Sequence, residues 1–287
     1  MKRRFFYFLS LIAIATFSQS EIDIAGIKYA SSTFGNYYDD IYSSKINKAA
    51  IFLNYGHDVG KKTNLFYHAS YHTINLDTQI NSDNIIADDF NLYQEIPNYS
   101  FINLAVGMTN KLKNNWSLNN ILSLTFSDNE KLKSHHYFRS FSYFKQKKSA
   151  NFNYGFGIYL SKLNKEISIV PILSLQYKNK TRGVKIFAPR ELKLWQSINT
   201  KSYIELQTIL NSNYLKLNNT DLDIELLSVN TELTYNYIYN KKIKLKTGLG
   251  LPYTKYQYIG NENTYKTDQI NLSYTIGFSY VVYKNVK

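Results

Sequence analysis

The sequence predicts an all-β protein: an up-and-down antiparallel transmembrane β-barrel of about fourteen strands that follows a cleaved signal peptide. Three features of the 287-residue chain support this expectation. Apolar and polar side chains alternate over long segments, short and long connections alternate between those segments, and the N-terminus has the pattern of an export signal. We expect residues 1–20 to be the signal peptide and residues 21–287 to form one barrel domain.

The alternation is clearest near the C-terminus, in the stretch INLSYTIGFSYVVY at residues 270–283. Every second residue from Leu272 to Val282 is apolar or aromatic, whereas the residues between them are nearly all small or polar. Successive side chains of a β-strand point to opposite faces, so a period of two predicts a strand with two chemically different sides. We expect this strand to close the barrel against the first one, at about residues 21–30.

The same alternation recurs along the chain. Clear examples are residues 102–110, 151–161 and 229–239. In ISIVPILSLQY, residues 167–177, the alternation blurs, because Val170 and Ile172 fall on the second face. The recurrence predicts many strands of one kind, with one face toward lipid and one toward an enclosed interior.

The connections between these segments alternate in length. Short polar turns fall at 60–64, 113–115, 147–149, 178–182, 199–201 and 240–242. Longer connections fall at about 31–46, 78–98, 128–134, 163–165, 188–190, 216–226 and 260–267. Outer-membrane barrels have this rhythm, with tight periplasmic turns and longer outer loops. The strand count depends on Pro189, which either separates two short strands, giving about fourteen, or marks a bulge in one strand, giving about twelve.

The first twenty residues, MKRRFFYFLSLIAIATFSQS, have a basic start, an apolar run and small residues near the end. This is the pattern of a signal peptide cleaved just after Ser20, and the apolar run is short for a membrane-spanning helix of ~20 residues. Removal of the segment lowers the formal charge from +13 to +10. We therefore expect export to the outer membrane of a Gram-negative bacterium.

A soluble β-sandwich is the main alternative, because its strands also alternate. Several segments here run well beyond the ~5–6 residues of an ordinary strand, and their polar face is rich in Asn, Ser, Thr and Gly. Exposure of so many Phe, Tyr and Leu side chains to water would cost ~25 cal/mol per Å² of apolar area. Lipid removes this cost, and barrel closure satisfies the backbone hydrogen bonds.

A family resemblance supports the same fold. The stretch IVPILSLQYKNKTRGVKIFAPRELKLWQSINTKSYIELQTILNSNYLKL, residues 169–217, is similar to the middle of a family of Bacteroidota outer-membrane β-barrels described as domain of unknown function 6268. The similar elements are a strand with Pro171, a strand that runs into Ala188 and Pro189, and a polar turn at 199–201. The resemblance implies the fold, the location and assembly by the barrel-assembly machinery; it supplies no activity and no catalytic residues.

The sequence offers no catalytic, cofactor-binding or metal-binding set. Cysteine is absent, and His68 and His72 on one strand lie ~13 Å apart along the backbone, too far for one zinc ion. His68 and Ser70 share a strand face and form the only pairing for a nucleophile and its base. A barrel-type hydrolase, either a phospholipase or a protease, is therefore the alternative to a function without catalysis.

The main expectation is a narrow pore or small-solute binder, or else a structural barrel of the envelope. Its lumen-lining candidates are polar residues on the second strand face: Asn103, Asn153, Glu205, Gln207, Glu232, Asn236, Lys244 and Lys246. Lysines are scattered through the turns and loops, which favours contact with outer-membrane lipid and lipopolysaccharide over nucleic-acid binding. A small solute is a further expected partner, and no cofactor is expected.

Overall fold

The computed structural model describes residues 21–33, 35–37, 42–80, 98–129, 132–163, 166–216, 223–259 and 264–283. The expected signal peptide, residues 1–20, lies outside the described residues. The strands are β1 (Glu21–Ser32), β2 (Gly35–Tyr37), β3 (Tyr42–Val59), β4 (Thr63–Ile80), β5 (Asn98–Lys111), β6 (Trp116–Asn129), β7 (Leu132–Lys147), β8 (Phe152–Leu163), β9 (Glu166–Lys178), β10 (Arg182–Ala188), β11 (Glu191–Ser197), β12 (Ser202–Lys216), β13 (Asp223–Tyr239), β14 (Ile243–Ile259), β15 (Thr264–Ile270) and β16 (Ser273–Tyr283). The described ranges hold no helix that is long and apolar enough to span a membrane.

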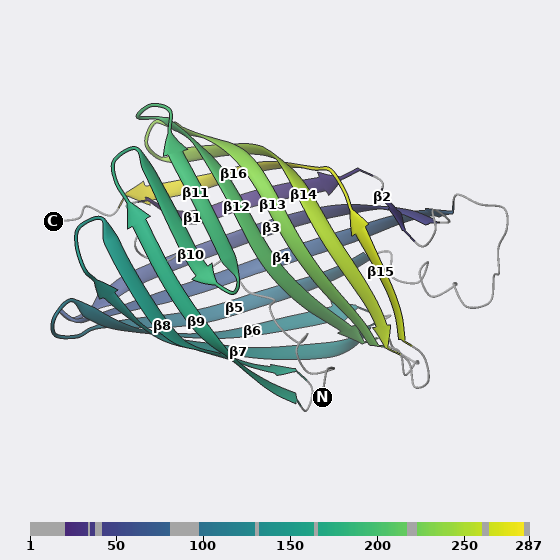
Figure 1. The fold of residues 1–287 in the computed structure, drawn as a ribbon, viewed down its shortest axis with the longest axis horizontal. Helices are drawn as coiled ribbons and strands as arrows, with labels where there is room; N and C mark the ends of the chain where they lie inside the picture. Colours follow the sequence, from purple (N-terminus) through teal and green to yellow (C-terminus); the bar gives the residue numbers. More distant parts are fainter. Residues whose placement is uncertain are drawn as a thin grey trace.

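The strands form one closed sheet in which every pair of neighbours is antiparallel (Figure 1). β1 pairs with β3 on one side and with β16 on the other, where Tyr29 lies opposite Ile276. β2 continues along β3 beyond the end of β1, and β15 continues along β14 in front of β16. Because β2 and β15 only extend the edges beside β1 and β16, the sixteen strands form a barrel wall that is fourteen strands around. This confirms the fourteen-stranded barrel and the closing role of the last strand.

The two faces of the wall differ as the alternation predicts. In β16, Ile276 is 59% exposed, whereas the neighbouring Thr275 is only 4% exposed. The outer face carries the exposed apolar and aromatic side chains of the long strands, and the inner face carries mostly small, polar and charged ones, apart from one apolar cluster. A barrel in lipid requires this distribution, because hydrocarbon solvates only the outer face.

Tight turns at one end of the barrel have a local explanation. The turn after β5 has Asn114 at φ 55° and Asn115 at φ 61° as its central residues, closed by a 3.2 Å hydrogen bond from the Trp116 N–H to the Lys113 carbonyl. Two-residue hairpin turns with positive φ match the twist of the flanking strands, and Asn adopts this conformation more readily than most residues. The short polar turns of the sequence are therefore strand reversals.

One hairpin is much shorter than the rest. β10 and β11 have 7 residues each, compared with 13 in β9 and 15 in β12. Pro189 lies between them, so it separates two short strands. At the hairpin tip the Leu210 N–H donates to the Arg190 carbonyl at 2.9 Å, and β12 also contacts β7. Beyond the tip, the described strands have no hydrogen-bonded ladder between β9 and β12, and Leu210 of β12 packs there against buried apolar side chains.

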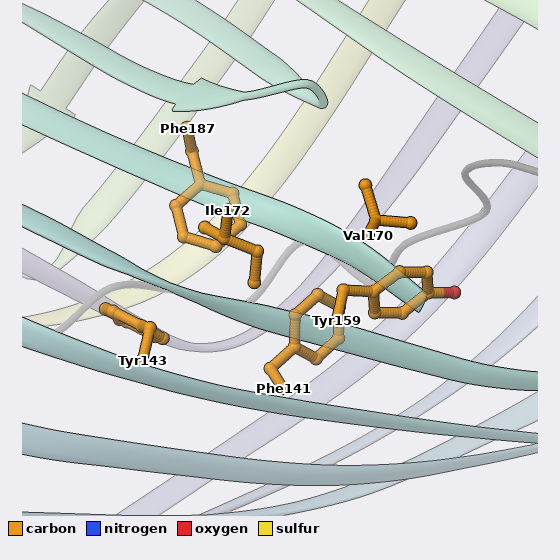
Figure 2. Close-up of a cluster of buried hydrophobic side chains, with 6 residues drawn as sticks. All are labelled: Phe141, Tyr143, Tyr159, Val170, Ile172 and Phe187. Atoms are coloured by element: carbon orange, nitrogen blue, oxygen red, sulfur yellow. The ribbon is translucent and has the colours of Figure 1, made fainter. Parts of the chain in front are cut away.

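An apolar cluster fills the interior at this place (Figure 2). We call it the apolar seam; its buried members are Phe141, Tyr143, Tyr159, Val170, Ile172 and Phe187, with Ile121 and Leu210 packed against them. The ring centroids of Phe141 and Tyr159 are 4.7 Å apart, and those of Tyr143 and Phe187 are 5.7 Å apart. The blurred alternation of β9 therefore has a cause: Val170 and Ile172 point inward and bury themselves in the seam.

Candidate functional site

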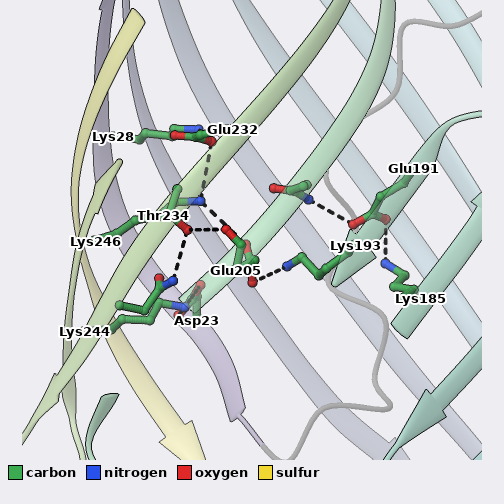
Figure 3. Close-up of polar contacts among 12 residues, drawn as sticks. Asp23, Lys28, Lys185, Glu191, Lys193, Glu205, Glu232, Thr234, Lys244 and Lys246 are labelled. Atoms are coloured by element: carbon green, nitrogen blue, oxygen red, sulfur yellow. Dashed lines mark hydrogen bonds and ion pairs between the residues drawn. The ribbon is translucent and has the colours of Figure 1, made fainter. Parts of the chain in front are cut away.

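Charged side chains gather on the inner surface beside the apolar seam, which they meet on the β10–β11 hairpin, where Phe187 pairs with Glu191 (Figure 3). We call this set the charged wall; it comprises Asp23, Lys28, Lys185, Glu191, Lys193, Glu205, Glu232, Lys244 and Lys246. They come from β1 and from β10 to β14, at positions that alternate with the lipid-facing apolar residues. The strand period brings most of them inside the barrel. Asp23 and Lys28 lie five residues apart on β1, and both face inward because the β1–β16 pairing shifts register between residues 23 and 25.

Two glutamates form the centre of the charged wall. Glu205 accepts from the Lys193 ammonium at 2.9 Å and lies 3.7 Å from that of Lys246. Lys246 is also 3.6 Å from Glu232, which in turn accepts from Lys28 at 3.3 Å. Both glutamates are buried, so each needs these cations to offset the free energy of removing its charge from water.

A second group of charges extends the wall along β10 and β11. The Lys185 ammonium lies 2.6 Å from the Glu191 carboxylate, whose other oxygen accepts from the Gln207 amide at 2.9 Å. At the other end, Lys244 lies 2.6 Å from Asp23, which also accepts from the Ser279 hydroxyl at 3.0 Å. The ion pairs therefore run across the wall from β10 to β1.

The predicted lumen residues lie in several arrangements. Glu205, Gln207, Glu232, Lys244 and Lys246 belong to the hydrogen bonds and ion pairs described above. Buried Asn236 donates to the Thr234 hydroxyl at 3.1 Å, next to the charged wall.

Two predicted asparagines lie elsewhere on the inner face. Asn103 of β5 is buried and accepts from the Thr125 hydroxyl at 2.5 Å. Asn153, near the start of β8, has a buried side-chain oxygen with no hydrogen-bond partner in the described part of the chain. The structure brings neither of these two into the charged wall.

Several members of the charged wall are absent from the sequence-based candidates. These are Asp23, Lys28, Lys185, Glu191 and Lys193. Lys28, Lys185, Glu191 and Lys193 alternate with lipid-facing residues along their strands, so the period-two pattern was the available signal for them; Asp23 faces inward because of the register shift in β1. The ion pairs of Lys28 and Asp23 depend on the barrel closure, since their partners lie 204 and 221 residues away in sequence.

A chain of neutral polar groups lies on β3 and β4. We call it the hydroxyl chain, and its members are Asn54, His68, Ser70 and His72. The Asn54 side-chain oxygen is 2.7 Å from His68 Nδ1, and the Ser70 hydroxyl is 3.0 Å from His68 Nε2 and 2.9 Å from His72 Nε2. The two imidazoles thus converge on one hydroxyl, although their backbone positions are far apart.

Asp23 joins the two polar regions. Its main-chain carbonyl accepts from the Asn54 amide at 2.8 Å, while its carboxylate binds Lys244. Asp23 sits where the β1–β16 pairing shifts register between residues 23 and 25, and this irregularity frees its carbonyl for a side chain. The hydroxyl chain and the charged wall are therefore parts of one interior network.

The fold is that of an outer-membrane β-barrel, because the sheet is closed, its outer face is apolar and its interior is largely polar. The chain belongs to the family described as "Domain of unknown function (DUF6268)", whose family model matches residues 84–283. No curated protein matches the sequence.

Solved structures of other proteins are similar to the chain at low sequence identity. The COG4313 outer membrane channel from Pseudomonas putida F1 is 10% identical, with a TM-score of 0.51 over 90% of this chain and 94% of that chain. The KdgM porin is 12% identical, with a TM-score of 0.37 over 89% of this chain and 98% of its own. LpxR from Salmonella typhimurium is 9% identical, with a TM-score of 0.37 over 88% and 99% respectively. The first similarity supports the barrel fold.

Proposed function

We propose that the chain is a narrow outer-membrane barrel whose lumen passes or binds small polar solutes, with a preference for anions. The observation that supports this proposal most directly is the composition of the charged wall. Its ion pairs contain five lysines, Lys28, Lys185, Lys193, Lys244 and Lys246, and four acidic residues, Asp23, Glu191, Glu205 and Glu232. The excess of cations would attract negatively charged solutes.

The low-dielectric protein around these charges and two further buried cations strengthen the attraction of anions. Charges that line a narrow pore select ions by the sign of their excess, because the low-dielectric protein focuses their field. Two further buried cations, Arg139 and Arg190, add to the positive balance of the interior. The ion pairs hold the lysine side chains in place, so an entering anion meets an ordered array of donors.

The fold and the N-terminal sequence also support a cellular location in the outer membrane. We infer that residues 1–20 direct export through the inner membrane and are removed, and that the barrel then inserts into the outer membrane of a Gram-negative bacterium. Its partners there would be outer-membrane lipid, lipopolysaccharide and the barrel-assembly machinery, with a small solute in the lumen. The belt of exposed apolar side chains supports the lipid contacts.

Single-channel recording tests the pore. Folded protein in a planar bilayer under a KCl gradient should give discrete current steps, and the reversal potential should have the sign of a preference for chloride. Lys246→Gln removes a lumen cation and should move the reversal potential toward zero. Lys241→Gln, at the tip of the β13–β14 turn, is the matched control and should leave it unchanged.

The absence of current steps in the bilayer would contradict the proposal of a pore. The protein must first show heat-modifiable migration on a gel, so that silence is not due to misfolding. Silence from a folded barrel, together with no binding of small anions by calorimetry, would favour a structural role in the envelope. A cation preference would reverse the proposed selectivity.

A further inference from the structure

We propose that Ser70 is the nucleophile of an ester-hydrolysing site inside the barrel, with His68 as its general base and Asn54 as the residue that orients the base. The hydroxyl chain supplies the geometry. A nucleophile and base within hydrogen-bond reach, with the base oriented by a third group, are the arrangement that activates a serine. The sequence shows that His68 and Ser70 share a strand face; the fold adds Asn54 and His72.

The direction of each hydrogen bond follows from the Asn54 amide. Its nitrogen donates to the main-chain carbonyl of Asp23, so its oxygen must face His68. A carboxamide oxygen only accepts, so His68 Nδ1 carries the proton and Nε2 has a free lone pair. Ser70 therefore donates its hydroxyl proton in a hydrogen bond to His68 Nε2. The His68 tautomer with its proton on Nδ1 is the one that a general base requires.

The strand geometry holds these groups rigidly. His68, Ser70 and His72 occupy alternate positions of β4, so all three point into the barrel. Asn54 lies directly opposite His68 on β3 in the antiparallel register. Side chains directly opposite each other on adjacent strands lie close together, which explains the 2.7 Å contact without any loop. Catalytic groups on paired strands are held more precisely than groups on loops.

Donors for the developing negative charge lie around the hydroxyl. With Ser70 donating to His68, the hydroxyl oxygen accepts from the Nε2–H of His72. Asn103 lies directly opposite Ser70 on β5, and because its oxygen accepts from Thr125, its amide nitrogen is the group left to donate. Neutral donors stabilise the oxyanion of a tetrahedral intermediate, which forms on the former carbonyl oxygen of the substrate and not on the Ser70 oxygen. The His72 Nε2–H would therefore move its hydrogen bond from the Ser70 oxygen to that oxyanion as the ester reacts.

Aromatic side chains border the same place and indicate the kind of substrate. The Phe101 ring stacks on His72 with a centroid distance of 4.6 Å, and Phe52 lies directly opposite Ser70 on β3. Flat apolar surfaces beside the hydroxyl suit a short acyl or aryl group. The substrate class is therefore a small carboxylic ester that enters through the lumen.

The reaction proceeds through an acyl-enzyme. The Ser70 oxygen attacks the ester carbonyl carbon while His68 takes the hydroxyl proton. The carbon–oxygen bond to the alcohol then breaks, and His68 returns the proton to the leaving alkoxide. Water next attacks the acyl carbon, His68 accepts its proton and passes it to the Ser70 oxygen as the acid leaves. The sum is ester plus water to acid plus alcohol.

A serine-reactive probe tests the site on the whole folded barrel in detergent. Incubation with a fluorophosphonate, followed by peptide mass mapping, should place one adduct on Ser70 of the unmodified protein. The same protein should hydrolyse p-nitrophenyl butyrate, and His68→Ala should lower the labelling rate by a factor of ~100 or more, the typical contribution of a general base. Mapping on the unmodified chain does not depend on a variant that folds.

Ser123→Ala is the matched control. Ser123 is also a buried inner-face serine, but within the described residues its hydroxyl has no hydrogen-bond partner. Labelling and ester hydrolysis should be unchanged in this variant and lost in Ser70→Ala. A folded barrel with no adduct on Ser70, or with equal adducts on Ser70 and Ser123, would overturn the proposal. Conductance is a separate measurement, so the pore and the ester hydrolysis can fail independently.

Discussion

The charged wall and the apolar seam are both inner surfaces of the same barrel, yet they are held together by different forces. The charged wall rests on continuous strand pairing from β10 to β14 and on through β16 to β1, and its side chains satisfy one another by ion pairs. The seam lies where β10 and β11 end early and β12 meets its neighbours through side chains. Most of the charges lie where the backbone ladder is complete, and the apolar residues lie beside the interruption, with Lys185, Glu191 and Phe187 of the short hairpin at the border between the two.

Physical chemistry gives a reason for this division. A buried charge requires fixed partners in good geometry, and a complete hydrogen-bonded ladder supplies that rigidity. Apolar packing needs no directional partner and closes an irregular gap by filling it. The small inner-face residue Gly157 fits this purpose, because a Cβ at that position would collide with Tyr143 of the seam.

The largest expected effect concerns the charged wall. Glu205→Ala leaves Lys193 and Lys246 without one of their buried partners, so the free energy of unfolding should fall by ~3–5 kcal/mol. Urea unfolding in lipid vesicles measures the loss. The double variant Glu205→Ala with Lys193→Ala should be less destabilised than the sum of the single variants. Simple additivity would show that this ion pair contributes no coupling.

The seam should respond to lost volume instead of lost charge. Ile172→Ala removes a side chain that is 2% exposed, and the cavity should cost ~2–5 kcal/mol. Ile172→Val, which keeps most of the volume, is the control and should cost ~0.5–1.5 kcal/mol. Equal unfolding midpoints for the two variants would mean that the seam does not close the wall by packing.

The smallest of these effects concerns the outer face, which both regions share. Ile276→Arg places a charge in lipid and should cost ~2–4 kcal/mol, whereas Thr275→Arg on the inner face should cost less. Thermal shift of the heat-modifiable band compares the two neighbours directly. If both substitutions are equally tolerated, the assignment of the two faces in β16 is wrong, although the structure exposes Ile276 and buries Thr275.

Much of the fold was predictable from local pattern. The fourteen strands, the closing role of residues 270–283 and the facing of residues such as Ile276 follow from the period of two and the rhythm of the turns. Pro189 remained ambiguous between two short strands and one bulged strand, because a proline is compatible with both. The seam was visible only as the irregularity of Val170 and Ile172, whose partners lie on other strands.

The candidate site was predictable only in part. Glu205, Glu232, Lys244 and Lys246 were identified as inward-facing, because facing depends only on position within a strand. The pairing of His68 with Ser70 was also recognisable, since both lie on one strand. The contact of Asn54 with His68 depends on the register between β3 and β4, and that of His72 with Ser70 depends on side-chain geometry. The contact of Asp23 with Lys244 depends on the closure of the barrel.

The sequence by itself determined which side of the regular strands faces lipid, because a strand alternates its side chains every residue. The register shift after Asp23 in β1 is the exception, since it arises from the pairing with β16. The tertiary structure alone decided which inward residues meet. Closure of the sheet sets the register between β1 and β16 and brings the Asp23 carboxylate to Lys244, whereas the pairing of β1 with β3 places its carbonyl against Asn54. Contacts between residues so far apart in the chain depend on the geometry of the whole barrel, which no local pattern encodes.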